Sequence, residues 1–258
     1  MKISKYKKGS NGIYKVVLDD GRTLSLYEDV ILKFNFLIVS DIDEKTIIEA
    51  EKYNQECDVY YVALKSIRSR LRSSYELQRF LLHKQYPTNL IDKAIHKLEK
   101  QGYLNDQLFA RSYIYHQMIT TNKGPLKIEK ELLEKKVSNG IINEELVVFS
   151  SEEQAERIDK LVKKSIKTNR SFGGIVLMRK ICNGISNLGY DSSLIRSVLS
   201  NYSFENDVDI AKREYEKLYH RYCHKYSGED LKRKIREKLF LKGLSCDDEL
   251  FNNLKGDW

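Results

Sequence analysis

A turn followed by a short amphipathic helix recurs four times along this chain, at intervals of about 50 residues. An interval of about 50 residues is long enough for three helices of about a dozen residues each, together with their turns. A second register agrees, because Asn105–Ala110 and Asn206–Ala211 share Asn, Asp and Ala at the same offsets. The sequence therefore predicts tandem three-helix repeats. The four turns are assigned to Gln85-Tyr86, Gly140-Ile141, Gly189-Tyr190 and Gly243-Leu244.

Helix signals dominate from about residue 60 onward. The whole chain of 258 residues holds only two prolines, which usually interrupt helices. Apolar residues within Ile91–Leu98 fall on one helical stripe, and Gly102 is well placed to end that helix. Ser73 and Glu76 form a capping-box pattern at a helix start. The body of the protein is predicted to be helical.

The N-terminal segment has a different pattern. Ile13–Leu18 and Arg22–Tyr27 are rich in β-branched and aromatic residues, and Asp20-Gly21 between them favours a hairpin. A third strand at Ile3–Lys8 is expected to support it. The predicted fold is mainly α, with tandem three-helix repeats forming an elongated curved body and a small N-terminal β-hairpin module. The predicted domains are a hairpin-plus-helix module at 1–58, three-helix repeats at 59–121, 122–168 and 169–225, and a partial fourth repeat at 226–258.

Basic residues are concentrated in particular segments of the chain. The formal net charge is +8 and the pI about 9.1, which favours polyanionic partners. Residues 62–84, 160–180 and 211–242 carry most of the excess, and these segments are called the basic blocks. In the first block, helical spacing predicts that Lys65, Arg68 and Arg72 share one face. A charged run on a helix is commonly a solvated face, and three such runs weaken that interpretation. The predicted partner- or nucleic-acid-binding residues are Lys65, Arg68, Arg72, Arg79, Lys163, Lys164, Lys167, Arg170, Arg179, Lys180, Arg213, Arg233 and Arg236.

The cysteines and the N-terminus indicate the compartment. Cysteines at positions 57, 182, 223 and 246 show no C-x-x-C spacing, and free thiols fit a reducing compartment. The N-terminus is basic and lacks the apolar run of a signal peptide. No run of 18 apolar residues occurs, so no membrane span or membrane partner is expected. A cytoplasmic protein is predicted.

Catalytic and metal-binding patterns are scarce. Neither a P-loop nor a G-x-G-x-x-G motif occurs, and no cofactor or catalytic residue is predicted. His220, Cys223 and His224 lie within about one helical turn and are possible metal ligands. A fourth ligand is not apparent, so surface histidines are the favoured interpretation. The tyrosines are assigned to core packing in preference to base stacking.

Three sets of residues carry a more specific signal: Gly102–Asp106 with Phe109-Ala110 and Tyr113, Lys123-Gly124 with Lys127-Ile128 and Glu131-Leu132, and Arg72-Ser73 with Glu76-Leu77. These segments resemble the RecX family of regulatory proteins. They lie within residues 60–160, and the tandem helices extend the likeness to the C-terminus. The second repeat departs from the family pattern, with Lys135–Ile141 as a longer turn where the family has Lys-Gly-Ile or Lys-Gly-Val.

The resemblance implies a bacterial modulator of the recombinase RecA. Family members bind RecA and its filament on single-stranded DNA, and restrain filament growth, ATP turnover and strand exchange without chemistry of their own. The chain is expected to act as a monomer and to contact single- or double-stranded DNA as well. Direct nucleic-acid binding as the main activity is the alternative, motivated by charge alone, and an unrecognised enzyme is the third hypothesis.

Overall fold

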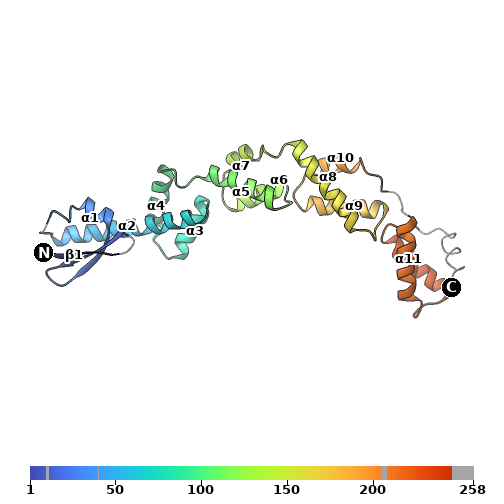
Figure 1. Ribbon diagram of the computed structural model, residues 1–258, viewed down its shortest axis with the longest axis horizontal. Coiled ribbons are helices and arrows are strands. Elements are labelled where there is room, and N and C mark those ends of the chain that lie inside the picture. The colour runs from blue at the N-terminus through green and yellow to red at the C-terminus, as the bar shows by residue number, and fades with distance from the viewer. Residues whose placement is uncertain (10–11, 40, 205–207, 246–258) are drawn as a thin grey trace. The chain divides into compact units, whose positions relative to one another are not determined.

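The computed structural model describes residues 1–9, 12–39, 41–204 and 208–245 (Figure 1). Within these ranges the chain forms twelve α-helices and one three-stranded sheet, which confirms the expected mainly helical class. Contacts divide the chain into two compact units, residues 1–113 with 132–145 and residues 114–131 with 146–258. The segment 246–258, where the second half of the partial fourth repeat was expected, lies outside the described residues.

The N-terminal sheet has the three predicted strands. They are β1 (Ile3–Lys8), β2 (Ile13–Leu18) and β3 (Thr23–Tyr27), antiparallel in the order β1-β2-β3. Gly21 in the β2–β3 turn has φ +86°, a conformation that glycine adopts without steric cost. Alternate side chains of β2 and β3 point into a core, whose members on the sheet are Val16, Leu18, Leu24 and Leu26.

Two helices cover the apolar face of the sheet. α1 (Glu28–Lys33) contributes Val30 and Ile31 to its core, and α2 (Glu44–Ser69) contributes the buried face of its first half. Asp43 caps α2, with its carboxylate accepting from the Thr46 amide. α2 then continues unbroken for 26 residues and supplies the first helix of the next core. The predicted domain boundary between residues 58 and 59 therefore falls inside one helix.

The carboxylate of Asp58 joins the sheet to the helical region. It accepts hydrogen bonds from the Tyr27 hydroxyl at 2.7 Å and from the Tyr86 hydroxyl at 2.6 Å. The Tyr27 ring also stacks on Tyr61, with centroids 4.9 Å apart. Burial and the hydrogen bond to Asp58 raise the pKa of Tyr86 to about 12, and the same causes raise the pKa of Tyr27 further.

We expect alkaline pH to weaken this junction. A raised folded-state pKa means that the contribution to stability is complete below the ordinary tyrosine pKa of 10 and is lost as pH rises through about 12. Tyr86→Phe should lower the free energy of unfolding by about 1.5–3 kcal/mol at neutral pH, and should flatten the loss above pH 10. Thermal melts from pH 8 to 12 would measure both. Tyr115→Phe, at a half-exposed position, is the control and should change neither.

The remaining helices begin and end at recognisable signals. The predicted capping box is present at Ser73, and Pro125 is the first residue of its helix, a position where proline's missing amide hydrogen is not needed. Gly102 has φ +74° and ends its helix as predicted. The helices are α3 (Ser74–His83), α4 (Thr88–Lys100), α5 (Asp106–Thr120), α6 (Pro125–Glu134), α7 (Asn139–Leu146), α8 (Ser151–Thr168), α9 (Gly174–Ser186), α10 (Ser192–Leu199), α11 (Val208–Tyr222) and α12 (Gly228–Phe240).

One turn recurs after every third helix, namely after α3, α6, α9 and α12. Its residue with positive φ is Gln85, Lys136, Gly189 or Gly243, so the spacing is about 50 residues throughout. The sequence prediction of a turn at Gly140-Ile141 was wrong, because Gly140 lies inside α7. Lys136 adopts φ +59° in place of the expected glycine, and the amide of Val137 closes the turn onto Leu132. The second turn is therefore as short as the others.

These turns accept hydrogen bonds from the start of a helix in the preceding part of the chain. The Ser73 hydroxyl donates to the Lys135 carbonyl at 3.0 Å. The Gly124 amide donates to Leu188 at 2.7 Å, and the Gly173 amide donates to Lys242 at 2.9 Å. We call these three contacts the helix–turn joints. Each joint thus hydrogen-bonds a helix start to the turn that follows a later helix.

The glycines at two joints leave no room for a side chain. A Cβ on Gly124 would lie 2.5 Å from the Gly189 carbonyl oxygen, and one on Gly189 would lie 2.4 Å from the Lys127 amide nitrogen. A Cβ on Gly243 would lie 2.3 Å from the Gly173 carbonyl oxygen. Glycine is thus required for close backbone approach as well as for the turn.

Helices share cores in groups. The second half of α2 packs with α3 and α4, α8 packs with α9 and α10, and α11 packs with α12. The first group begins near residue 59, as the predicted repeat does, whereas the groups that start with α8 and α11 begin one helix before residues 169 and 226. The repeat boundaries themselves stay a prediction.

Candidate interaction surfaces

The first predicted basic block lies around the end of α2. Lys65 and Arg68 are exposed on its last turns. α2 ends at Ser69, and Arg70 is already extended, so Arg72 does not share their helical face as the sequence spacing suggested. Ser73 starts a new capped helix, which is why the helix stops before it. Lys65 and Arg68 are therefore the members of this block that are presented together by one helix.

Arg72 has a packing role in this structure. Its guanidinium lies 4.8 Å from the centre of the Phe80 ring, and its Nε is buried without a hydrogen-bond partner. Burial, with the neighbouring charge of Arg70, lowers the pKa of Arg72 below its ordinary value. Arg79 is exposed on α3. The exposed Arg79 on α3 can therefore contact a ligand, whereas Arg72 is half-buried.

The second block extends from α8 into α9. Lys163, Lys164 and Lys167 are exposed on α8, and Lys163 forms an ion pair with Asp159 at 2.7 Å. That hydrogen bond from Lys163 to Asp159 raises the pKa of Lys163. Arg170 follows the helix and donates from Nε to the Lys167 carbonyl at 3.0 Å. Lys164 and Lys167 therefore project from α8 without the acidic neighbour that Lys163 has.

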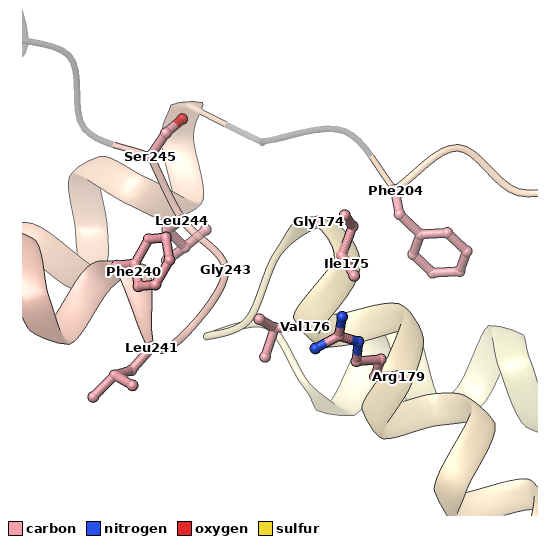
Figure 2. Close-up of a pocket in the computed structure, with 10 residues that line it drawn as sticks. All are labelled: Gly174, Ile175, Val176, Arg179, Phe204, Phe240, Leu241, Gly243, Leu244 and Ser245. Atoms are coloured by element: carbon pink, nitrogen blue, oxygen red, sulfur yellow. The ribbon is translucent and has the colours of Figure 1, made fainter.

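Arg179 and Lys180 are exposed on α9. Lys180 lies 3.8 Å from the centre of the Phe172 ring. Arg179 lines a pocket of about 670 Å³. Figure 2 shows Ile175, Val176 and Arg179 on the α9 side, with Phe240 and Leu241 on the other side. The walls are mostly apolar, and the guanidinium is the charged group among the lining side chains.

The third block lies on α11 and α12. Arg213 is exposed and donates from Nε to the Asp209 carbonyl at 3.1 Å. Arg233 pairs with Asp230 at 3.0 Å, and both side chains are largely exposed. Arg236 is exposed on the next turn of α12. A surface ion pair of this kind contributes little to stability, so Arg233 can exchange Asp230 for an anionic ligand.

A buried carboxylate lies beneath the third block. Glu214 is 4% exposed and pairs with Lys217 at 2.8 Å and Lys242 at 2.5 Å. Burial acts to raise the pKa of Glu214, and the hydrogen bonds and charges of the two lysines lower it overall. The backbone carbonyl of Lys242 also accepts a hydrogen bond from the Gly173 amide, so this cluster adjoins a helix–turn joint.

A basic pocket was not anticipated from the sequence. It holds about 310 Å³ between the end of α5 and α8. The Arg157 guanidinium there pairs with Glu153 at 2.6 Å and donates to the Met118 carbonyl at 3.1 Å. Tyr190 lines the pocket with a buried hydroxyl. Arg157 lies outside the dense Lys/Arg runs, so charge counting did not single it out. Lys160 and Lys164 complete the basic part of the wall.

The histidine and cysteine cluster considered from sequence is not assembled. Within the ranges the structure describes, no three His, Cys, Asp or Glu side chains are grouped as metal ligands. Cys223 instead donates from its thiol to the His220 carbonyl, and His224 is exposed. Among the described helices, none is both long enough and apolar enough to cross a bilayer.

Comparison with known proteins identifies relatives over almost the whole chain. A regulatory protein RecX of Bacillus subtilis is 30% identical over 250 residues, covering 95% of this chain and 94% of the relative. A regulatory protein RecX of Streptococcus sanguinis is 28% identical over 253 residues, covering 96% of each. A crystal structure of a regulatory protein RecX superimposes with a TM-score of 0.70 at 26% identity, over 77% of this chain and 98% of that one.

The family model for the second three-helix domain of RecX matches residues 105–146. This span contains α5, α6 and α7, and begins at the Asn105 cap. The crystal structure of RecX from Lactobacillus salivarius shares the fold, with a TM-score of 0.55 over 58% of this chain and 97% of that one. Identity to the Bacillus subtilis protein along nearly the full length settles the relationship, and the chain belongs to the RecX family of regulatory proteins.

Proposed function

We propose that this protein regulates the recombinase RecA by binding it and its filament on single-stranded DNA. The bound protein restrains filament growth, ATP turnover and strand exchange, acting in the cytoplasm as a monomer and without chemistry of its own. The observation that carries the proposal is the full-length likeness to regulatory RecX proteins. Support also comes from the exposed Lys65, Arg68, Lys164 and Lys167, which are available to an anionic nucleoprotein.

The proposal is tested with purified protein, RecA and single-stranded DNA. We expect ATP turnover by preformed filaments to fall as the protein approaches one copy per bound RecA or less. Fluorescence anisotropy of a labelled DNA strand would report the loss of filament in the same samples. Unchanged ATP turnover together with unchanged anisotropy at stoichiometric protein would contradict the proposal.

Charge reversal on α8 should weaken the effect. Lys164→Glu with Lys167→Glu removes two exposed cations from one helix face, and we expect the apparent affinity for the filament to fall at least about tenfold at moderate salt. Lys52→Glu with Lys100→Glu changes the net charge equally at exposed positions outside the predicted blocks. If both double variants bind equally weakly, net charge decides binding and the α8 residues have no special role.

Direct nucleic-acid binding is the second candidate, favoured by the exposed basic side chains alone. It requires no recombinase, and its affinity falls steeply with salt, with a slope of about −0.7 per contacted phosphate for single strands. Tight binding to DNA with no effect on RecA would favour this candidate over the first.

A further inference from the structure

The outer face of the N-terminal sheet carries lysines that none of the predicted blocks includes. The strand register places Lys7, Lys15 and Ser25 side by side across β1, β2 and β3. The next row along the strands is Lys5, Val17 and Thr23. Residues two apart on a strand share a face, so these six side chains form one surface, which we call the lysine face.

The lysine face is opposite the core. Val16 and Leu24, in the intervening positions, are buried against α1 and α2, whereas Lys5, Lys7, Lys15, Thr23 and Ser25 are all exposed. No carboxylate occupies the two rows. Among the described residues no ion pair involves any of these three lysines, while nearby Arg22 pairs with both Asp20 and Glu44. The positive charge of this face is therefore uncompensated within the part of the chain that is described.

The arrangement of two lysines is unfavourable for an isolated sheet. Lys7 and Lys15 are direct partners in the β1–β2 pairing, and like charges directly opposite each other destabilise a sheet. Lys5 adds a third charge one strand repeat away, about 7 Å along β1. A bound polyanion would remove this repulsion, because each phosphate can lie between neighbouring ammonium groups.

We propose that the lysine face binds the sugar–phosphate backbone of nucleic acid, without sequence preference. Lysines with neighbouring Ser and Thr hydroxyls are the side chains that contact phosphates. A protein partner is disfavoured, because the cores of protein interfaces are depleted in lysine and contain aromatic anchors. Only Val17 is apolar in the two rows, and it is half-buried. This contact is separate from recombinase binding, so it is measurable on nucleic acid alone.

The test uses the full chain and a fluorescent oligothymidylate of about 30 nucleotides, with no recombinase present. Lys5→Gln, Lys7→Gln and Lys15→Gln are combined in one variant. Loss of three phosphate contacts should reduce the slope of log affinity against log salt by about 2, at about 0.7 per contact. Replacing the same three lysines by arginine should restore the slope, because the charge returns. The glutamine variant should melt no lower than the wild type, since the Lys7–Lys15 repulsion is removed.

The control variant removes three exposed lysines that lie on α2 and α4, outside the lysine face. Lys45→Gln, Lys52→Gln and Lys100→Gln lower the net charge equally but leave the lysine face intact. Equal loss of slope in both triple variants would overturn the proposal, since net charge alone would explain it. The proposal would also be overturned if the lysine-face variant bound the oligonucleotide as tightly as the wild type does. If that variant then lost affinity for DNA-free RecA, the lysine face would be assigned to a protein partner. Failure of the RecA assays leaves this result unaffected.

Discussion

Replacement of Gly189 by alanine should open the joint between the α9–α10 turn and the start of α6. The residue has φ +90°, and its Cβ would lie 2.4 Å from the Lys127 amide nitrogen and 2.5 Å from the Lys127 Cβ. Alanine at this positive φ costs about 1–2 kcal/mol of backbone strain. The clash between its Cβ and the Lys127 backbone adds about 1–3 kcal/mol. We expect a loss of about 3 kcal/mol in the free energy of unfolding and a melting temperature lower by roughly 10 °C.

Gly102→Ala is the matched control for this substitution. Gly102 has φ +74°, and a Cβ there meets nothing within 4 Å. It should show the backbone cost alone, about 1 kcal/mol. Hydrogen exchange gives the local readout, because the Gly124 and Leu126 amides donate to Leu188 and Gly189 across the joint. If the two variants were equally destabilised and the Gly124 and Leu126 amides stayed protected, the close approach of Gly189 to Lys127 would contribute nothing to the free energy of unfolding.

The second large effect is expected at Glu214. Glu214→Ala leaves Lys242, whose side chain is 28% exposed, without its carboxylate partner. Removing one member of a buried pair costs about 3–5 kcal/mol, and the partial exposure of Lys242 reduces this to about 3 kcal/mol. Denaturant unfolding would measure the loss. Glu237→Ala removes an exposed partner of Lys234 on α12 and should leave stability unchanged.

The sign of the pH dependence follows from the lowered pKa of Glu214. Stability from a carboxylate with a depressed folded-state pKa is complete above the ordinary glutamate value of 4.5 and is lost as pH falls through the folded-state value. The wild type should therefore lose stability below pH 4.5 more steeply than Glu214→Ala. Parallel acid curves for the two proteins would show that Glu214 is not held ionised by Lys217 and Lys242.

Local signals in the sequence predicted the elements well. The three strands were expected from β-branched runs around Asp20-Gly21, and the helix start at Ser73 and stop at Gly102 follow from capping chemistry. These features depend on residues a few positions apart. Their physical cause is contained in the local sequence, and the structure confirms them.

The features that were missed depend on backbone conformation or on distant contacts. The second turn was assigned to Gly140 because glycine is the usual residue at positive φ, whereas the chain uses Lys136 there. Arg72 was counted with Lys65 and Arg68 because helical spacing was extended past Ser69. The helix–turn joints unite positions about 60 residues apart, and nothing in the local sequence reports such a contact. The lysine face was overlooked because its charges alternate with core residues along the strands.

The unbroken course of α2 restricts how this chain can be divided. A cut at the predicted boundary near residue 58 would separate Asp58 from Val59 in mid-helix and break the backbone hydrogen bonds that span that point. Both fragments would then expose apolar surface, since Cys57 is buried in the core of the sheet and Val59 in the core of α3 and α4. The sheet and the first helical group therefore have no linker between them at which a protease could separate two intact pieces. We therefore expect the sheet and this helical group to unfold together and to stay in one fragment under limited proteolysis.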